Sequence, residues 1–262
     1  MTAAARRCSF KKADRDHRRG MFSTLAMGIS FGGGRTVPGK IVNDPENEAA
    51  LRELCNNPAM IRIAGFGSKL LATYAPRAFL HMSDRLRRLL AHHPSLALNF
   101  TNSAYPAASF NFGPSTVCYS HTDAANDACN WCHITALGNF NPTTSGHIVI
   151  RNLKAIFEFP AGSSASIPSA IFEHGNTPIQ PHETRQSFTQ YCAGGLLRWV
   201  DCGFRTLGDY RLSDPAGKAA FDAALKARVD SGIQRFSSLE SLLAGMEGAS
   251  GSGSKAGDGR GG

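Results

Sequence analysis

The feature that most constrains the fold is a run of short apolar segments between residues 109 and 192, separated by turn-forming residues. The segments that read as strands are residues 109–112, 133–137, 147–153, 155–159, 163–167, 170–174 and 185–192. The connections contain Asn141-Pro142, Ser145-Gly146 and Asn176-Thr177-Pro178. Short strands at even spacing are typical of a barrel or a double-sheet jelly roll. We therefore predict an α+β fold whose core, about residues 100–205, is a double-stranded β-helix of the jelly-roll or cupin-like kind.

Helical patterns precede this run of strands. Residues 45–55 open with a proline and carry acidic residues in the first turn, and residues 68–92 place apolar residues at helical spacing, with a break expected at Pro76. Such helices would buttress one sheet of the core. Residues 28–39 are glycine-rich but lack the Lys-Ser/Thr ending of a phosphate-binding loop, which argues against an ATP site and favours a tight turn on the barrel.

A second pattern within the strand-rich region suggests a metal centre. His121 and Asp123 are separated by one residue, His174 follows about fifty residues later, and Arg185 and Ser187 come next. If residues 121–123 form a strand, the two side chains share one face. Two imidazoles and one carboxylate can hold one face of Fe(II) and leave positions open for substrate and O2. The guanidinium of Arg185 can bind a carboxylate of 2-oxoglutarate through two parallel hydrogen bonds.

Other interpretations of these residues were weighed. His182 competes with His174 as third ligand, but it lies in a turn-like stretch only three residues before Arg185, so we favour His174. The stretch Cys129-Asn130-Trp131-Cys132-His133 matches the attachment pattern of a c-type haem. The lack of a secretion signal and the neighbouring metal motif argue that this match is accidental, and no second ligand pair supports a zinc site.

Longer stretches carry a resemblance to a known family. They include Arg62-Ile63-Ala64-Gly65-Phe66-Gly67, Phe110-Asn111-Phe112-Gly113-Pro114, Gly146-His147-Ile148-Val149, Ser187-Phe188-Thr189-Gln190-Tyr191 and Gly194-Gly195-Leu196-Leu197-Arg198-Trp199. Over about residues 28–206 the chain resembles the TET/JBP-type oxygenase domains expanded in mushroom-forming (basidiomycete) fungi. The resemblance implies Fe(II), 2-oxoglutarate and O2, and oxidation of a methyl group on a nucleic-acid base, typically 5-methylcytosine in DNA.

The resemblance also implies roles for particular residues. The metal ligands fall on His121, Asp123 and His174, and the distal carboxylate of 2-oxoglutarate falls on Arg185 with Ser187 beside it. Asn126 takes the place of a base-contacting asparagine, and Tyr191 that of an aromatic ring that stacks on a flipped base. A second base-contacting histidine of the animal enzymes would fall near Ala193, where no such side chain exists, so N6-methyladenine stays open as the base.

The chain divides into four parts by composition. We expect a basic disordered arm over residues 1–20, the oxygenase domain over residues 21–212, C-terminal helices over residues 213–246 and a disordered tail over residues 247–262. The seven cysteines are scattered and odd in number, which suggests reduced thiols in the nucleus or the cytoplasm. No apolar run is long enough for a membrane span, so we expect no membrane partner.

The net charge of +8 favours an anionic partner, although it says nothing about the fold. We expect a monomer that acts on nucleic acid, DNA in the first place, in the nucleus. Two alternatives remain from the sequence. One is the same oxygenase chemistry on a protein, an RNA or a small molecule, and the other is an inactive copy that only binds nucleic acid.

Overall fold

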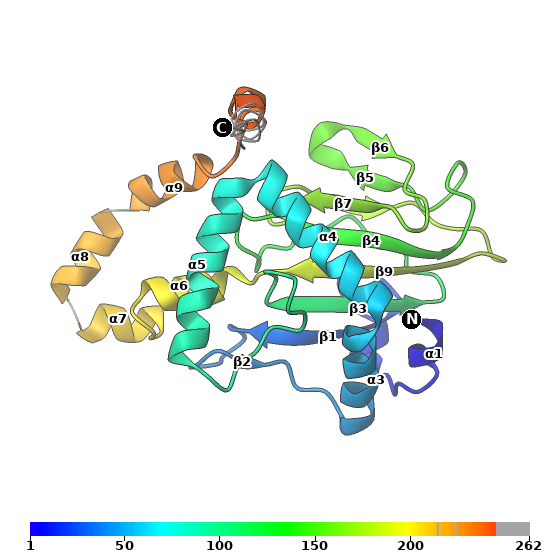
Figure 1. Ribbon diagram of the computed structural model, residues 1–262, viewed down its shortest axis with the longest axis horizontal. Coiled ribbons are helices and arrows are strands. Elements are labelled where there is room, and N and C mark those ends of the chain that lie inside the picture. The colour runs from blue at the N-terminus through cyan, green and yellow to red at the C-terminus, as the bar shows by residue number, and fades with distance from the viewer. Residues whose placement is uncertain (214, 224, 245–262) are drawn as a thin grey trace, which may run out of the picture.

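Two antiparallel sheets form the body of the protein (Figure 1). The computed structural model describes residues 1–213, 215–223 and 225–244. The larger sheet has the order β2-β1-β3-β9-β4-β7, with β1 Ser23–Ser30, β2 Gly39–Lys40, β3 Ala107–Gly113, β4 Cys132–Asn139, β7 Ser164–Ile167 and β9 Thr184–Tyr191. The smaller sheet has the order β6-β5-β8, with β5 Ile148–Ile150, β6 Ala155–Phe157 and β8 His174–Asn176. This is the double-stranded β-helix that the strand spacing predicts.

On the central strands of the larger sheet, apolar and polar side chains alternate, so they lie on opposite faces of the sheet. On β3 and β9, Phe110 and Phe188 are completely buried and pack together at 5.2 Å between ring centroids. Their neighbours in sequence, Asn111 on β3 and Ser187 on β9, point to the opposite face of the sheet. Burying an aromatic side chain of this size contributes about 1.5–3 kcal/mol. The apolar face therefore anchors the sheet, and the polar face is left to line a cavity.

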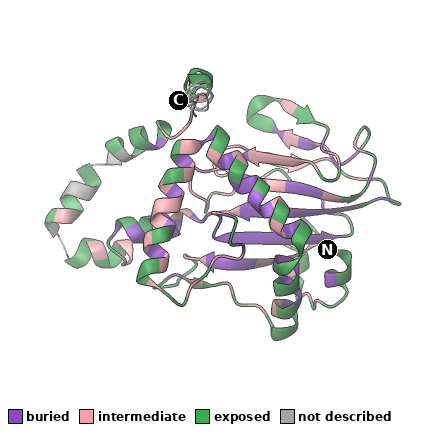
Figure 2. Cartoon of the chain, viewed as in Figure 1, coloured by how far each residue is buried: buried purple, intermediate pink, exposed green. Residues whose placement is uncertain are grey.

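Three helices cover the apolar face of the larger sheet (Figures 1 and 2). They are α3 Pro45–Asn56, α4 Pro58–Tyr74 and α5 Pro76–His92. Each begins with proline, whose missing N–H costs nothing in a first helical turn, and the break predicted at Pro76 is confirmed. Gly67 of α4 lies directly against the buried ring of His133 on β4, so the helix approaches the sheet only because no Cβ intervenes.

The core between the two sheets is smaller. Ile148 and Ile150 of β5 pack against the inward-facing residues of β4, which include Cys132 and Ala136. His133 follows Cys132 on β4 and faces the helices instead, because neighbouring strand residues point to opposite faces. The two residues cannot serve one haem attachment, in agreement with our interpretation of the Cys-x-x-Cys-His match as accidental.

The first twenty residues differ from the predicted disordered arm. They contain two short helices, α1 Thr2–Ala5 and α2 Lys12–Arg15. Ala4 is only 4% exposed and belongs to the core beneath α3. Asn47 of α3 accepts from the Ser9 amide and donates to the Ser9 carbonyl, both at 2.8 Å. Basic composition suggests a solvated tail, but these contacts hold the segment on the folded domain.

Several local predictions need correction. Residues 170–173 were predicted to be part of a strand, but they form a turn after Pro168, and the strand begins only at His174. Residues 28–30 belong to β1 rather than to a turn, because residues 23–28 pair with β3 and residues 29–30 pair with β2, which extends the core sheet on the N-terminal side of residue 100. Residues 194–201 form a further helix, α6 Gly194–Asp201, that packs with α5.

Beyond α6 the chain continues as α7 Leu207–Ser213, α8 Pro215–Ala223 and α9 Leu225–Ile233. In Figure 1, α7 and α8 lie at the far left, and α9 leads back toward α5, where Arg77 donates to the Gln234 carbonyl at 2.9 Å. Helices α8 and α9 lie within residues 213–246, where C-terminal helices were predicted. The tail predicted over residues 247–262 lies outside the described residues. Within the described ranges, the structure contains no helix with the length and apolar character that a membrane crossing requires.

Candidate metal centre

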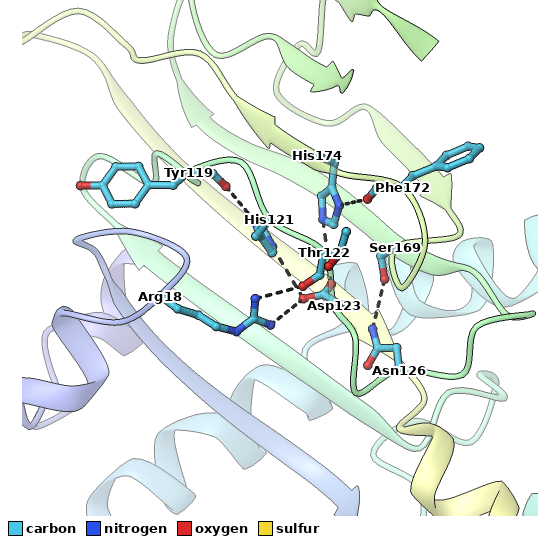
Figure 3. Close-up of polar contacts among 9 residues, drawn as sticks. All are labelled: Arg18, Tyr119, His121, Thr122, Asp123, Asn126, Ser169, Phe172 and His174. Carbon is cyan, nitrogen blue, oxygen red and sulfur yellow. Dashed lines mark hydrogen bonds and ion pairs between the residues drawn. The ribbon is translucent and has the colours of Figure 1, made fainter. Parts of the chain in front are cut away.

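His121, Asp123 and His174 meet at one end of the smaller sheet (Figure 3). The Nε2 atom of His121 lies 3.6 Å from Asp123 Oδ1, and the Nε2 atom of His174 lies 3.9 Å from Asp123 Oδ2. The donor atoms of all three residues lie within 4.8 Å of one another. Right-angled ligands at metal bonds of about 2.1 Å are about 3 Å apart, so small side-chain shifts would suffice to bind a metal.

Backbone hydrogen bonds orient both imidazoles. The His121 Nδ1–H donates to the carbonyl of Tyr119 at 2.7 Å, and the His174 Nδ1–H donates to the carbonyl of Phe172 at 2.8 Å. A carbonyl only accepts, so in each ring the proton lies on Nδ1 and the Nε2 lone pair faces Asp123. Burial lowers the pKa of His121, which keeps its ring in the neutral form that ligates metals.

The sequence had suggested a strand over residues 121–123, but His121 and Asp123 lie on a loop with a single bridge residue. His121 and His174 form an isolated antiparallel bridge, with reciprocal backbone hydrogen bonds of 3.0 and 2.9 Å. The Asp123 amide then donates to the carbonyl of Ser169 at 2.8 Å. These bonds turn the carboxylate toward both histidines. His182, the competing ligand, is exposed in the turn before β9 and takes no part.

Arg185 lies beside the triad and is 3% exposed. One guanidinium nitrogen donates to the Thr116 carbonyl at 3.0 Å, and the Phe140 ring lies 5.8 Å from its carbon. Its Nε atom is buried without a hydrogen-bond partner in the described residues, and no carboxylate there forms an ion pair with it. Burial lowers the pKa of Arg185, but a guanidinium stays charged at neutral pH. A buried unpaired cation of this kind is suited to an anionic ligand.

Two adjoining cavities meet at Asp123. The inner one, of about 40 Å³, is lined by the triad, Arg185 and Ser187. The outer one, of about 250 Å³, is lined by Asn126 and Tyr191, among others. Both include Arg19, Asp123 and Thr189 in their walls. The arrangement thus places a narrow cavity around Arg185 next to a wider one, with Asp123 in the wall of both.

Asn126 and Tyr191, predicted to contact a base, both line the outer cavity. Asn126 Nδ2 donates to Ser169 Oγ at 3.1 Å, which leaves Oδ1 to accept (Figure 3). Burial raises the pKa of Tyr191, and Ser109 lines the same cavity beside it.

The sequence reasoning missed several residues at this site. Arg18 donates to the Thr122 carbonyl at 3.0 Å and lies 3.4 Å from Asp123 Oδ1 (Figure 3). The carbonyl of Arg19 accepts from the Tyr119 amide at 2.7 Å. Nothing local in the sequence distinguishes these arginines from the others in the basic segment. Asn111 was also missed, although its polar side chain between two phenylalanines on a strand could have indicated the cavity face.

The donor set fits Fe(II), 2-oxoglutarate and O2. Two imidazoles and one carboxylate on one side of a site are typical of non-haem iron oxygenases, and Arg185 with Ser187 fits the distal carboxylate of 2-oxoglutarate. The double-stranded β-helix and this site together match what an Fe(II)- and 2-oxoglutarate-dependent oxygenase requires.

No protein-family model and no curated protein sequence matches the chain. Among solved structures, NgTET1 in complex with 5mC DNA shares 16% identity at a TM-score of 0.47, over 65% of this chain and 61% of its own. A 2OG-Fe(II) oxygenase family oxidoreductase from Burkholderia pseudomallei shares 17% at 0.40, over 72% of this chain and 74% of its own.

A third similar structure is the viral collagen prolyl hydroxylase vCPH from Paramecium Bursaria Chlorella virus-1, in a 2OG complex. It shares 15% identity at a TM-score of 0.26, over 42% of this chain and 69% of its own. This chain thus spans less than two thirds of the length of NgTET1. At these low scores, the geometry of the chain's own residues carries the conclusions below.

Proposed function

We propose that this protein is an Fe(II)- and 2-oxoglutarate-dependent dioxygenase that oxidises the methyl group of a methylated nucleic-acid base, 5-methylcytosine in DNA first and N6-methyladenine second. One observation carries the proposal. The triad of His121, Asp123 and His174 shares a cavity with the buried, unpaired Arg185, and Asp123 also lines a second cavity beside it. The narrower resemblance to the fungal TET/JBP-type family stays a prediction from the sequence.

The residues around the inner cavity would hold the iron and its co-substrate. His121, Asp123 and His174 would ligate Fe(II) through Nε2, a carboxylate oxygen and Nε2, while Arg185 would pair with the distal carboxylate of 2-oxoglutarate. When bound, iron supplies the oxidising chemistry, in which 2-oxoglutarate, O2 and the methylated base become succinate, CO2 and the hydroxymethylated base. The low exposure of Arg185 strengthens its pairing with an anion, because a dry site screens charges weakly.

The residues around the outer cavity would position the base. An enzyme that acts on a base must take it out of the stack, and an aromatic side chain then receives it. Tyr191 supplies such a ring. The free Oδ1 of Asn126 can accept from an exocyclic amino group, which both cytosine and adenine carry. The basic side chains of Arg18 and Arg19 on the same wall suit an anionic substrate. A DNA substrate would place the protein in the nucleus.

The proposal is tested with the purified protein, Fe(II) and 2-oxoglutarate mixed without oxygen. Oxygen is then admitted with oligonucleotides that carry 5-methylcytosine, N6-methyladenine or no methylated base. Mass spectrometry of digested nucleosides and quantification of succinate are the readouts. Asp123→Ala serves as the control without a metal carboxylate, and Tyr191→Ala as the control with an altered outer cavity.

The outcomes separate the competing functions. Oxidised methylcytosine or lost methyladenine with the wild-type protein, and neither with Asp123→Ala, supports the proposal and identifies the base. Succinate formation without any change in the oligonucleotides would indicate that the substrate is a protein, an RNA or a small molecule. Absence of succinate together with retained DNA binding would indicate an inactive nucleic-acid-binding copy.

A further inference from the structure

A row of three polar side chains crosses the centre of the larger sheet. Thr24 of β1 is paired in register with Asn111 of β3, which is paired in register with Ser187 of β9. Thr24 Oγ1 donates to Asn111 Oδ1 at 2.8 Å, and Asn111 Nδ2 donates to Ser187 Oγ at 2.8 Å. Asn111 is 2% exposed and Ser187 is 3% exposed, so water does not compete with the bond between these two residues.

The direction of the bond from Thr24 sets the direction of the next bond in the row. A threonine hydroxyl that donates to the amide oxygen requires the NH2 group of the amide to lie on the other side, toward Ser187. Ser187 Oγ therefore accepts from Asn111. The hydroxyl hydrogen of Ser187 has no acceptor among the side chains and backbone groups of the described residues, and Ser187 lines the inner cavity with Arg185. That hydrogen remains to be donated to whatever occupies the cavity.

We propose that Asn111 is a positioning residue that holds Ser187 as a hydrogen-bond donor toward the distal carboxylate of 2-oxoglutarate, and that Thr24 fixes the orientation of the Asn111 amide. This inference rests on the proposed use of 2-oxoglutarate. A carboxylate accepts hydrogen bonds and donates none, so a site for it needs donors only. Arg185 is a donor by nature, whereas a serine hydroxyl can do either. In the structure Thr24 donates to the amide oxygen and the amide NH2 group donates to Ser187, and this sense of the row leaves Ser187 its hydroxyl hydrogen.

The substitution Asn111→Asp tests the inference with almost no change of shape. The introduced carboxylate has no donor, so Ser187 must donate to it and turns its lone pairs toward the cavity. Binding of 2-oxoglutarate to the Mn(II)-loaded protein is measured by titration calorimetry, which needs no turnover. We expect affinity to fall about 10- to 100-fold, the range for a lost hydrogen bond to a charged group. Mn(II) affinity and the melting temperature are measured alongside.

A double-mutant cycle separates the hydroxyl from simple charge repulsion. If Asn111→Asp acts through Ser187, its effect shrinks to less than about threefold in a Ser187→Ala background, because no hydroxyl remains to be turned. Direct repulsion between the new carboxylate and 2-oxoglutarate would persist at full size in that background. The second outcome would overturn the inference.

Thr24→Val provides a second route that adds no charge. It frees the Asn111 amide to turn over, so we expect a several-fold loss of 2-oxoglutarate affinity. Thr135→Val is the matched control, because Thr135 is 1% exposed in the same sheet and bonds Ser164 Oγ at 2.7 Å on the helix-facing side. Equal affinities for Thr24→Val and Thr135→Val would overturn the role of Thr24 and Asn111. Wild-type protein that binds Mn(II) but no 2-oxoglutarate would overturn the proposed function, and this inference with it.

Discussion

Replacement of Arg185 by methionine tests the central electrostatic feature of the site. Methionine retains much of the apolar volume of the arginine stem but removes the charge and the fork of donors. Because Arg185 is buried and its Nε is unpaired, the charge contributes little to the protein alone and much to an anionic ligand. We therefore expect the substitution to separate ligand affinity from stability.

The expected magnitude follows from the contacts of Arg185. Truncation of one partner of a buried, hydrogen-bonded charge pair costs about 2–5 kcal/mol, which corresponds to about 30- to 5,000-fold in Kd. Without ligand, the variant loses the bond to the Thr116 carbonyl and the contact with Phe140, but also the penalty of a buried unpaired cation. These effects oppose each other, so unfolding free energy should change by no more than about 1 kcal/mol.

The assay combines titration calorimetry of 2-oxoglutarate into Mn(II)-loaded protein with denaturant unfolding. At 2-oxoglutarate equal to 100 wild-type Kd, the wild type should gain about 2.7 kcal/mol of stability, whereas a variant with 100-fold weaker binding should gain about 0.4 kcal/mol. Arg198→Met on the exposed side of α6 is the matched control. Binding of 2-oxoglutarate by Arg185→Met within threefold of the wild type would refute the assignment of Arg185.

Further predictions concern the metal ligand and the packing behind the site. Changes to residues that only contact metal ligands weaken metal binding by about 10- to 100-fold. Asp123→Ala removes a ligand, so the loss of Mn(II) affinity should be larger, and retained affinity in titration calorimetry would contradict the assignment. Burial lowers the pKa of His133 to about 4 from 6.5, so between these pH values only the unfolded chain binds the proton and stability falls with falling pH. His133→Asn should remove up to about 3 kcal/mol of this decline in the free energy of unfolding, measured by denaturant unfolding at several pH values. An unchanged dependence of the unfolding free energy on pH would count against this role of His133. Gly67→Ala places a Cβ against the buried His133 ring and should cost at least about 1–3 kcal/mol in denaturant unfolding, whereas an unchanged midpoint would refute this close packing.

Much of the fold could be predicted because strand and helix signals are local. The alternation in Ser109-Phe110-Asn111-Phe112 and the proline at the start of each covering helix act over a few residues. The strand expected over residues 170–174 was mostly wrong, since apolar residues also occur in the turn after Pro168. β1 was missed because its glycine suggested a turn, whereas Gly28 lies against the backbone of Pro106 and Ala107.

The candidate site shows the same division. The sequence by itself determined the kinds of donor, their order and their spacing, because two histidines, a carboxylate and an arginine are chemical identities written in the chain. It could not determine that Arg18 reaches Asp123, that Arg185 is unpaired, or that Asn111 joins Thr24 to Ser187. Those facts depend on the order of strands in the sheet and on burial. Both result from the packing of segments distant in sequence, which no local pattern encodes.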